Sequence, residues 1–196
     1  MAKKFYAVAE GKKTGVFTSW NEVKELVAGY KGARYKGFAT EEEAKTWLLG
    51  TKEPASYTYA AWVDGSYDAR RGVYGYGLLI TDKEGKVLYS EKGADAKKAY
   101  QRHRNVAGEV FGAMAAVNAA LRLGLSSLCI CYDYEGIRSW ATGAWRANLP
   151  LTQSYQRFMQ EAPLALTFKK IAAHSGVAEN EAADRLAKEA VAEFNR

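Results

Sequence analysis

The sequence predicts an α/β protein in two parts, a small ββαβα unit followed by a mixed five-stranded sheet flanked by helices. Two observations lead to this fold class. The first fifty residues switch between strand and helix periodicity in the order ββαβα. From residue 57 onward, three successive strand patterns precede a long helical stripe, and two further strands alternate with helices, which is typical of a sheet covered by helices.

Length and composition support two folded units. The chain has 196 residues, 48% hydrophobic and 26% charged, with three prolines, which is the range of globular proteins. Residues 51–56 lack periodicity and predict a linker between a domain at 1–50 and a domain at 57–196. The net charge of +6 favours an anionic partner, although many proteins with such a charge bind no nucleic acid.

The first unit contains signals for each of its elements. Gly11-Lys-Lys separates two β-prone stretches and predicts a hairpin. Asn21 is a plausible helix cap with Gly29 as the stop, and Thr40 opens a capping box. We expect strands at Phe5–Glu10, Thr14–Ser19 and Ala33–Phe38, and helices at Trp20–Tyr30 and from Thr40 through Ala44, Trp47 and Leu48.

The second unit begins with a meander, in which the turn Asp82–Gly85 joins two of three consecutive strands. A helical stripe then runs from Val106 to Leu121 and stops at Gly124. We expect strands from Tyr57 to Asp64-Gly65-Ser66 and at Tyr74–Thr81, Lys86–Glu91, Ser127–Tyr132 and Leu164–Ile171, with further helices from about Tyr134, from Leu151 and at Glu179–Phe194.

Acidic residues stand at special places in this pattern. Asp64 and Asp133 each fall where a predicted strand ends, the edge at which open α/β sheets collect ligands. Glu109 and Asp184 lie on predicted helices about 90° to 100° from the centre of the apolar stripe, at the margin between core and solvent. Taken singly, each acid could be a solvated charge, and spacing alone does not prove that they converge.

If the four carboxylates converge, they need cations. Two carboxylates about 4 Å apart repel by roughly 4 kcal/mol at an effective dielectric constant of 20. Hard oxygen ligands without a Cys or His set favour Mg²⁺ or Mn²⁺ over Zn²⁺. Two such ions about 4 Å apart can generate hydroxide and stabilise both oxygens of a phosphodiester displacement.

Two further features bear on the compartment. Cys129 and Cys131 lie in an apolar run and predict buried, reduced thiols, from which we expect a cytoplasmic protein. The first residues are interrupted by charge too early to supply the apolar stretch of a signal peptide. No window approaches the length of a membrane span.

Five motifs in order resemble the ribonuclease H family: Asp64-Gly-Ser66, Gly75-Tyr-Gly77, Asn105-Val-Ala-Gly-Glu109, Tyr132-Asp133 and the stretch from His174 to Asp184. The resemblance implies a ribonuclease H-like sheet in which Asp64, Glu109, Asp133 and Asp184 are catalytic acids that bind metal. It also implies that His174 is the mobile histidine that assists turnover. Asn105 would contact RNA 2′-hydroxyl groups, with Ser66 and Asn180 on the substrate side.

The first fifty residues resemble the hybrid-binding, or viroplasmin-like, domain of type I ribonucleases H through Phe5–Val8, Lys13–Phe17, Ser19–Asn21 and Ala33–Thr40. The resemblance implies that Tyr6, Trp20 and Lys36 contact the duplex. Alternatively, the two aromatic residues belong to a small core and Lys36 is a solvated charge. Gly37 stands where a second lysine commonly follows, which predicts weaker affinity for the hybrid.

Between Asp133 and Leu151, some family members carry a lysine-rich protrusion that grips the DNA strand. This chain keeps Trp140 and Trp145 but few of the basic residues. Trp145 and Arg146 could line the DNA groove, or the tryptophans could be core residues. A short basic protrusion would make the N-terminal domain more important for holding substrate.

Together these features predict a monomeric endonuclease that hydrolyses the RNA strand of RNA–DNA hybrids with two Mg²⁺ ions, which Mn²⁺ could replace, leaving 5′-phosphate and 3′-hydroxyl ends. Double-stranded RNA is a further partner that the N-terminal domain could take, and no membrane partner is expected. Two alternatives remain open. One is a non-catalytic protein that binds hybrids or double-stranded RNA, and the other is an integrase or DNA resolvase on the same fold.

Overall fold

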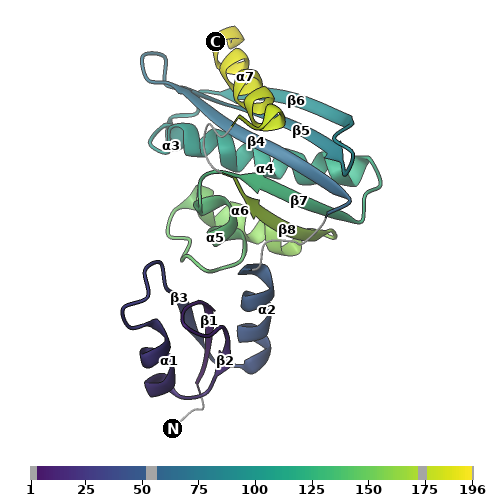
Figure 1. Ribbon diagram of the computed structural model, residues 1–196. Helices are drawn as coiled ribbons and strands as arrows, with labels where there is room; N and C mark the ends of the chain where they lie inside the picture. The colour runs from purple at the N-terminus through teal and green to yellow at the C-terminus, as the bar shows by residue number, and fades with distance from the viewer. Residues whose placement is uncertain (1–3, 52–56, 172–175, 196) are drawn as a thin grey trace. The chain divides into compact units, whose positions relative to one another are not determined.

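The computed structural model describes residues 4–51, 57–171 and 176–195. Contacts within the chain divide it into two compact units, residues 1–53 and 54–196, and each is described by itself. Figure 1 shows the strands and helices of both units.

The first unit is a three-stranded antiparallel sheet with two helices. Its strand order is β2-β1-β3, so that β1 is central. Val8, Phe17 and Val23 form its buried cluster, and Ala44 and Trp47 are also buried. The elements are β1 (Phe5–Glu10), β2 (Gly15–Phe17), α1 (Trp20–Val27), β3 (Arg34–Phe38) and α2 (Glu41–Thr51), which confirms the predicted ββαβα order.

The helix starts of this unit test two sequence predictions. At α2 the capping box is confirmed, because Thr40 Oγ1 accepts the Glu43 N–H at 3.2 Å and Glu43 Oε2 accepts the Thr40 N–H at 3.1 Å. The prediction of Asn21 as the cap of α1 is wrong. That helix begins at Trp20 with Ser19 as its N-cap, because the Trp20 ring packs between Tyr6 and Tyr35 and so fixes the first turn.

The second unit is a five-stranded mixed sheet of order β6-β5-β4-β7-β8. Strands β4, β5 and β6 form the predicted antiparallel meander, and β7 and β8 run parallel to β4. The strands are β4 (Tyr59–Asp68), β5 (Val73–Asp82), β6 (Val87–Asp95), β7 (Ser127–Tyr132) and β8 (Ala165–Lys170), and the helices are α3 (Lys98–Gln101), α4 (Asn105–Arg122), α5 (Gly136–Ala141), α6 (Pro150–Glu161) and α7 (Ala178–Glu193).

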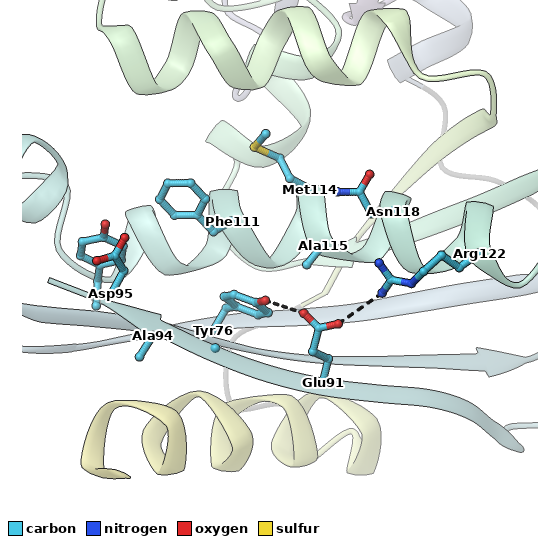
Figure 2. Close-up of a pocket in the computed structure, with 11 residues that line it drawn as sticks. Tyr76, Glu91, Ala94, Asp95, Phe111, Met114, Ala115, Asn118 and Arg122 are labelled. Carbon is cyan, nitrogen blue, oxygen red and sulfur yellow. Dashed lines mark hydrogen bonds and ion pairs between the residues drawn. The ribbon is translucent and has the colours of Figure 1, made fainter. Parts of the chain in front are cut away.

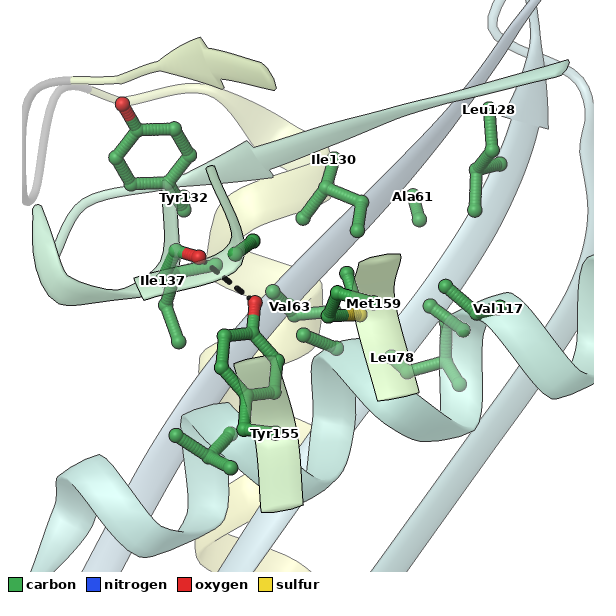
Figure 3. Close-up of a cluster of buried hydrophobic side chains, with 14 of the residues drawn as sticks. Ala61, Val63, Leu78, Val117, Leu128, Ile130, Tyr132, Ile137, Tyr155 and Met159 are labelled. Carbon is green, nitrogen blue, oxygen red and sulfur yellow. Dashed lines mark hydrogen bonds between the residues drawn. The ribbon is translucent and has the colours of Figure 1, made fainter. Parts of the chain in front are cut away.

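Helices cover both faces of this sheet. On one face, α4, α5 and α6 enclose the larger core, where the Tyr155 hydroxyl donates to the Ile137 carbonyl at 2.8 Å (Figure 3). On the other face, α7 packs over a smaller cluster that includes Trp62 and Ala183 (Figure 1). Central helix α4 is therefore buried between the sheet and two other helices.

Strand β4 continues four residues beyond Asp64, so the prediction that this strand ends at Asp64-Gly65-Ser66 is wrong. The length of β4 follows from its pairing with two different strands. Antiparallel β5 pairs with β4 as far as Asp68, whereas parallel β7 pairs only with Ala60 to Trp62. Asp64 therefore lies inside a strand but just past the end of β7, at the carboxyl edge of the parallel part of the sheet.

Glycines let both helices lie directly against the sheet. A methyl group added to Gly108 of α4 would overlap the Gly75 carbonyl oxygen and lie 3.1 Å from the Gly65 Cα. On the opposite face, a methyl group on Gly77 of β5 would overlap the Ala183 carbonyl oxygen of α7. Side chains at these positions would hold the helices away from the sheet, so the glycines set the spacing of the layers.

Two further sequence predictions concern burial. Cys129 and Cys131 are buried thiols in β7, as expected, while the cytoplasmic location stays a prediction. Among the residues that the structure describes, no helix is long and apolar enough to cross a membrane.

The contact at Gly108 predicts a specific sensitivity to a single methyl group. Gly108→Ala should lower the free energy of unfolding by about 2 kcal/mol, because overpacking against backbone outweighs the gain in helix propensity. Gly112→Ala is the matched control in the same helix, since the nearest atoms to its methyl group belong to the Tyr76 side chain, at 3.1 Å or more, rather than to backbone. Urea unfolding of the three proteins measures the effect, and equal stability of the two variants would contradict it.

Candidate active site

The four predicted acids come from four different elements of the second unit. Asp64 lies in β4, Glu109 in the second turn of α4, Asp133 directly after β7, and Asp184 in the second turn of α7. The parallel register pairs Trp62 with Cys131, so continuing it by two residues brings Asp64 level with Asp133. Helices α4 and α7 approach β4 from opposite faces of the sheet, one carrying Glu109 and the other Asp184.

The charges of these acids act on one another. Burial raises the pKa of Asp64 to about 6, and the negative charges of Asp133 and Asp184 add to the increase, while a hydrogen bond from the Gly65 N–H opposes it. Burial likewise raises the pKa of Glu109 to about 8, with further contributions from Asp133 and Asp64. The structure therefore places the four acids near enough for their charges to act on one another, with Asp64 influenced by Asp133 and Asp184 and itself acting on Glu109.

Glu109 is more deeply placed than the sequence predicted. Its side chain is 3% exposed, whereas its helical position indicated the margin of the core. A helix with one buried face would leave Glu109 at the edge of the core. Helix α4 is instead covered by the sheet on one side and by α5 and α6 on the other. Asp64, Asp133 and Asp184 are partly exposed, as a site open to a ligand requires.

Each of three acids has a partner within the protein. Asp64 Oδ1 accepts the Gly65 N–H at 2.7 Å, and Glu109 Oε1 accepts the Asn105 side-chain N–H at 3.2 Å. Asp184 Oδ2 forms an ion pair with Lys188 Nζ at 2.6 Å. Within residues 4–51, 57–171 and 176–195, no three His, Cys, Asp or Glu side chains are arranged to hold a metal ion.

The chemistry of these donors nevertheless fits a hard divalent cation. All four groups are carboxylates, the ligands that Mg²⁺ and Mn²⁺ prefer. A cation among them would offset both the burial and the repulsion that raise the pKa of Asp64 and Glu109. Rotation of the side chains away from their present partners would be needed for all of them to share an ion.

The other predicted residues of this unit lie in different settings. Asn105 is exposed as the first residue of α4, and Ser66 is partly exposed in β4 two residues past Asp64. Asn180 is buried in the first turn of α7, at 6% exposure. His174 falls outside the residues that the structure describes.

An exposed basic segment next to Asn105 was not predicted. Between β6 and α4 lie Lys97, Lys98, Arg102 and Arg104, all exposed. Arg104 has a φ of 52°, which residues with a side chain rarely adopt, where the chain turns into α4. The density of basic residues between positions 97 and 104 was the available signal in the sequence.

The two tryptophans of the segment after Asp133 lie in an aromatic cluster. The Trp140 and Trp145 rings are 5.9 Å apart, and Tyr134 lies 5.8 Å from the first and 6.4 Å from the second. Trp145 is 42% exposed and Arg146 is exposed, so the alternative that Trp145 is a core residue is wrong. Trp140 is partly buried beneath it.

In the first unit, aromatic side chains form an exposed row. The Tyr6 and Trp20 rings lie 5.5 Å apart, and the Trp20 and Tyr35 rings 5.7 Å apart. Trp20 and Tyr35 are each more than 40% exposed, so Trp20 is not a core residue. Tyr35 was missed by the sequence argument, although its place directly before Lys36 in a predicted strand was a signal.

Lys36 lies on the other face of that small sheet. Tyr35 pairs with Val8 and Gly37 with Tyr6, so these four share the α1 face, and the intervening Lys36 points to the α2 face. Its ammonium group lies 5.5 Å from the Phe38 ring centre. Lys36 is nevertheless on an edge strand, from which a long side chain can reach around the sheet.

Comparisons with known proteins match both units. A family profile described as "Ribonuclease H1 N-terminal domain" matches residues 4–48, and one described as "RNase H" matches residues 57–192. The second match spans more than half of the chain and contains all four acids.

The chain belongs to the ribonuclease H family.

Individual relatives agree with this assignment. Ribonuclease H1 of Rattus norvegicus is 26% identical over 253 residues, covering 94% of this chain and 88% of the rat protein. Ribonuclease H of Saccharomyces cerevisiae is 52% identical over 53 residues, but that match covers only 27% of this chain and 15% of the yeast protein. High identity is thus confined to a short stretch.

The ribonuclease H fold is also shared with solved structures. The crystal structure of LC11-RNase H1 in complex with an RNA/DNA hybrid has a TM-score of 0.57 at 20% identity, covering 68% of this chain and 96% of that one. At this identity the likeness shows the fold alone. It confirms the predicted ribonuclease H-like sheet.

Burial of Glu109 predicts how the metal-free ribonuclease H unit responds to pH. The pKa of Glu109 is raised from its ordinary 4.5 to about 8, so the folded chain holds this proton more tightly than the unfolded chain. The resulting stability is complete below the unfolded pKa and is lost as pH rises through the folded pKa. With EDTA present, the free energy of unfolding should therefore fall between about pH 5 and pH 8.

Glu109→Gln should remove most of this decrease. Above pH 8 its free energy of unfolding should exceed that of the wild type by roughly 3 kcal/mol. Glu84→Gln, a change at an exposed carboxylate, is the control and should follow the wild-type curve. Thermal unfolding followed by circular dichroism measures all three proteins across the pH range. Parallel curves for wild type and Glu109→Gln would show that the buried carboxyl does not titrate in this window.

Proposed function

We propose that this protein is an endonuclease that hydrolyses the RNA strand of RNA–DNA hybrids. The observation that carries the proposal is the meeting of four carboxylates, from β4, α4, α7 and the end of β7, beside the exposed Asn105. Family membership supports it, and the structural neighbour LC11-RNase H1 is described in complex with an RNA/DNA hybrid.

The acids would hold two divalent cations, Mg²⁺ or, in its place, Mn²⁺. Such ions supply a hydroxide nucleophile and neutralise charge on the attacking and leaving oxygens of a phosphodiester. Hydrolysis of this kind leaves a 5′-phosphate and a 3′-hydroxyl end. Asp64 is the central ligand in this proposal, because its charge interacts with the charge of each of the other three acids.

Other side chains would position these acids and the substrate. Asn105 is exposed and donates a hydrogen bond to Glu109, so this side chain would both orient a metal ligand and contact the RNA 2′-hydroxyl groups. Ser66 and Asn180 would line the substrate side, and His174 would move a proton during turnover. Lys188 holds Asp184 in place until a cation competes for it.

The first unit would bind the hybrid and, as a further ligand, double-stranded RNA. Tyr6, Trp20 and Tyr35 offer aromatic faces for stacking on sugar or base, and Lys36 offers a charge for phosphate. Trp145 and Arg146 would add contacts to the DNA strand from the second unit. We propose that the protein acts as a monomer.

Loss of the central carboxylate should separate cleavage from binding. Asp64→Asn is expected to abolish Mg²⁺-dependent cutting of a labelled hybrid while hybrid affinity stays within a few-fold of wild type, since the charge is lost but the shape is kept. Asp82→Asn, at the far end of the meander, is the control and should cut normally. Normal turnover by Asp64→Asn would remove Asp64 from the site, and a wild type that binds hybrid without cutting would leave only a binding protein.

The first unit makes a second, separable prediction. In an Asp64→Asn background, Trp20→Ala should weaken hybrid binding at every salt concentration, whereas Lys36→Ala should also reduce the salt slope by about one. Lys24→Ala, an exposed lysine on α1, is the control. Fluorescence anisotropy across a salt series measures each variant, and an unchanged slope for Lys36→Ala would exclude a phosphate contact there.

A further inference from the structure

A cavity of about 420 Å³ lies between α4 and the strands β5 and β6, outside the acid cluster. Figure 2 shows Asp95 at one end and Arg122 at the other, with Phe111 and Tyr76 between them. This volume lies within the usual range for small-molecule sites. Small residues contribute to the lining from both sides, Gly93 and Ala94 from β6 and Ala115 from α4.

This cavity is on the opposite side of α4 from the acids. At 3.6 residues per turn, Phe111, Met114 and Asn118 lie about 140° to 180° around the helix from Glu109. Tyr74 and Tyr76 likewise alternate on β5 with Gly75 and Gly77, which face α7. A ligand here would not touch the carboxylates of the candidate active site.

One buried polar group in the wall lacks a partner. Tyr74 is 2% exposed, and in the part of the chain that the structure describes its hydroxyl group has no hydrogen-bond partner. Burial, followed by the charge of the neighbouring Asp95, raises the pKa of this hydroxyl, which therefore stays neutral. The Asp95 carboxylate and the Lys97 N–H both lie near enough to this hydroxyl to influence its pKa, but neither forms a hydrogen bond of normal geometry with it. An unsatisfied buried hydroxyl is costly and indicates a missing partner.

The other carboxylate of the cavity is already engaged. Glu91 accepts hydrogen bonds from Tyr76 at 2.6 Å and Tyr89 at 2.5 Å, and it forms an ion pair with Arg122 at 3.4 Å. Asp95 accepts the Ala96 N–H at 2.6 Å and lies 3.7 Å from the exposed Lys97 ammonium group. Asp95 thus retains acceptor capacity beside the Tyr74 hydroxyl.

The charge of the lining selects the ligand. The lining residues carry two carboxylates and one guanidinium, and the Lys97 ammonium group beside Asp95 lies outside the lining, so the cavity itself is negative and disfavours phosphate groups. The Phe111 and Tyr76 rings and the Met114 side chain offer an apolar and aromatic wall. We propose that this cavity binds a small organic ammonium ion with an aromatic body, whose ammonium group bridges the Asp95 carboxylate and the Tyr74 hydroxyl.

Phenethylamine is the probe for this site, and phenylacetate, of the same shape but opposite charge, is the control ligand. Titration of the ¹⁵N-labelled protein should give saturable amide shifts along residues 91–95 and 111–122 with phenethylamine alone. Tyr74→Phe and Asp95→Asn should each weaken binding about tenfold, the loss expected for one hydrogen bond to a charged group. Glu84→Gln should leave it unchanged.

An unfolding measurement and a cavity-filling variant complete the test. Tyr74→Phe removes an unsatisfied hydroxyl, so its free energy of unfolding should equal or exceed that of the wild type. Ala115→Leu should fill the cavity and block the probe without changing a charge. Shifts spread over surface carboxylates, equal binding of phenylacetate, or binding that survives both Tyr74→Phe and Ala115→Leu would overturn the proposal, as would no saturable binding at millimolar probe.

Discussion

The close approach of two helices to strands β4 and β5 is the constraint on which the rest of the second unit depends. Helix α4 touches the backbone at Gly65 and Gly75 through Gly108, and α7 touches Gly77 through Ala183. At these contacts backbone meets backbone, so the first two turns of both helices lie close to the central strands. Carboxylates from opposite faces of the sheet can therefore meet beside a strand that carries a third.

This geometry packs the helices closely against the sheet, and it also brings several negatively charged carboxylates near one another. Burial first, and then repulsion from neighbouring carboxylates, favours the protonated forms of Glu109 and Asp64, so their charged forms carry a free-energy cost in the fold. The surrounding packing must offset that cost, and α4 provides it with a nearly continuous buried surface of small and apolar residues. A bound divalent cation, as proposed above, would offset the repulsion within this cluster.

The same helix separates two chemical environments. On the side of Glu109 it presents negative charge to a site beside exposed basic residues and Asn105, which suits a polyanionic substrate. On the side of Phe111 it borders an aromatic cavity with an unsatisfied Tyr74 hydroxyl and a carboxylate, which suits a small cation. In the first unit, the exposed aromatic row and Lys36 occupy different faces of one small sheet, so stacking and charge are divided there as well.

Periodicity and local motifs by themselves determined the order of the strands and of the longer helices, the capping box at Thr40 and the four acids as candidates, because each depends on residues close together in the chain; the short helix α3 was not predicted. Only the tertiary structure decided that β4 runs past Asp64, since its length follows from pairing with β5 rather than from its own sequence. The burial of Glu109 and the separation of Lys36 from Trp20 were likewise decided by neighbouring layers and strand register. Convergence of distant side chains depends on packing across the sheet, which no local pattern encodes.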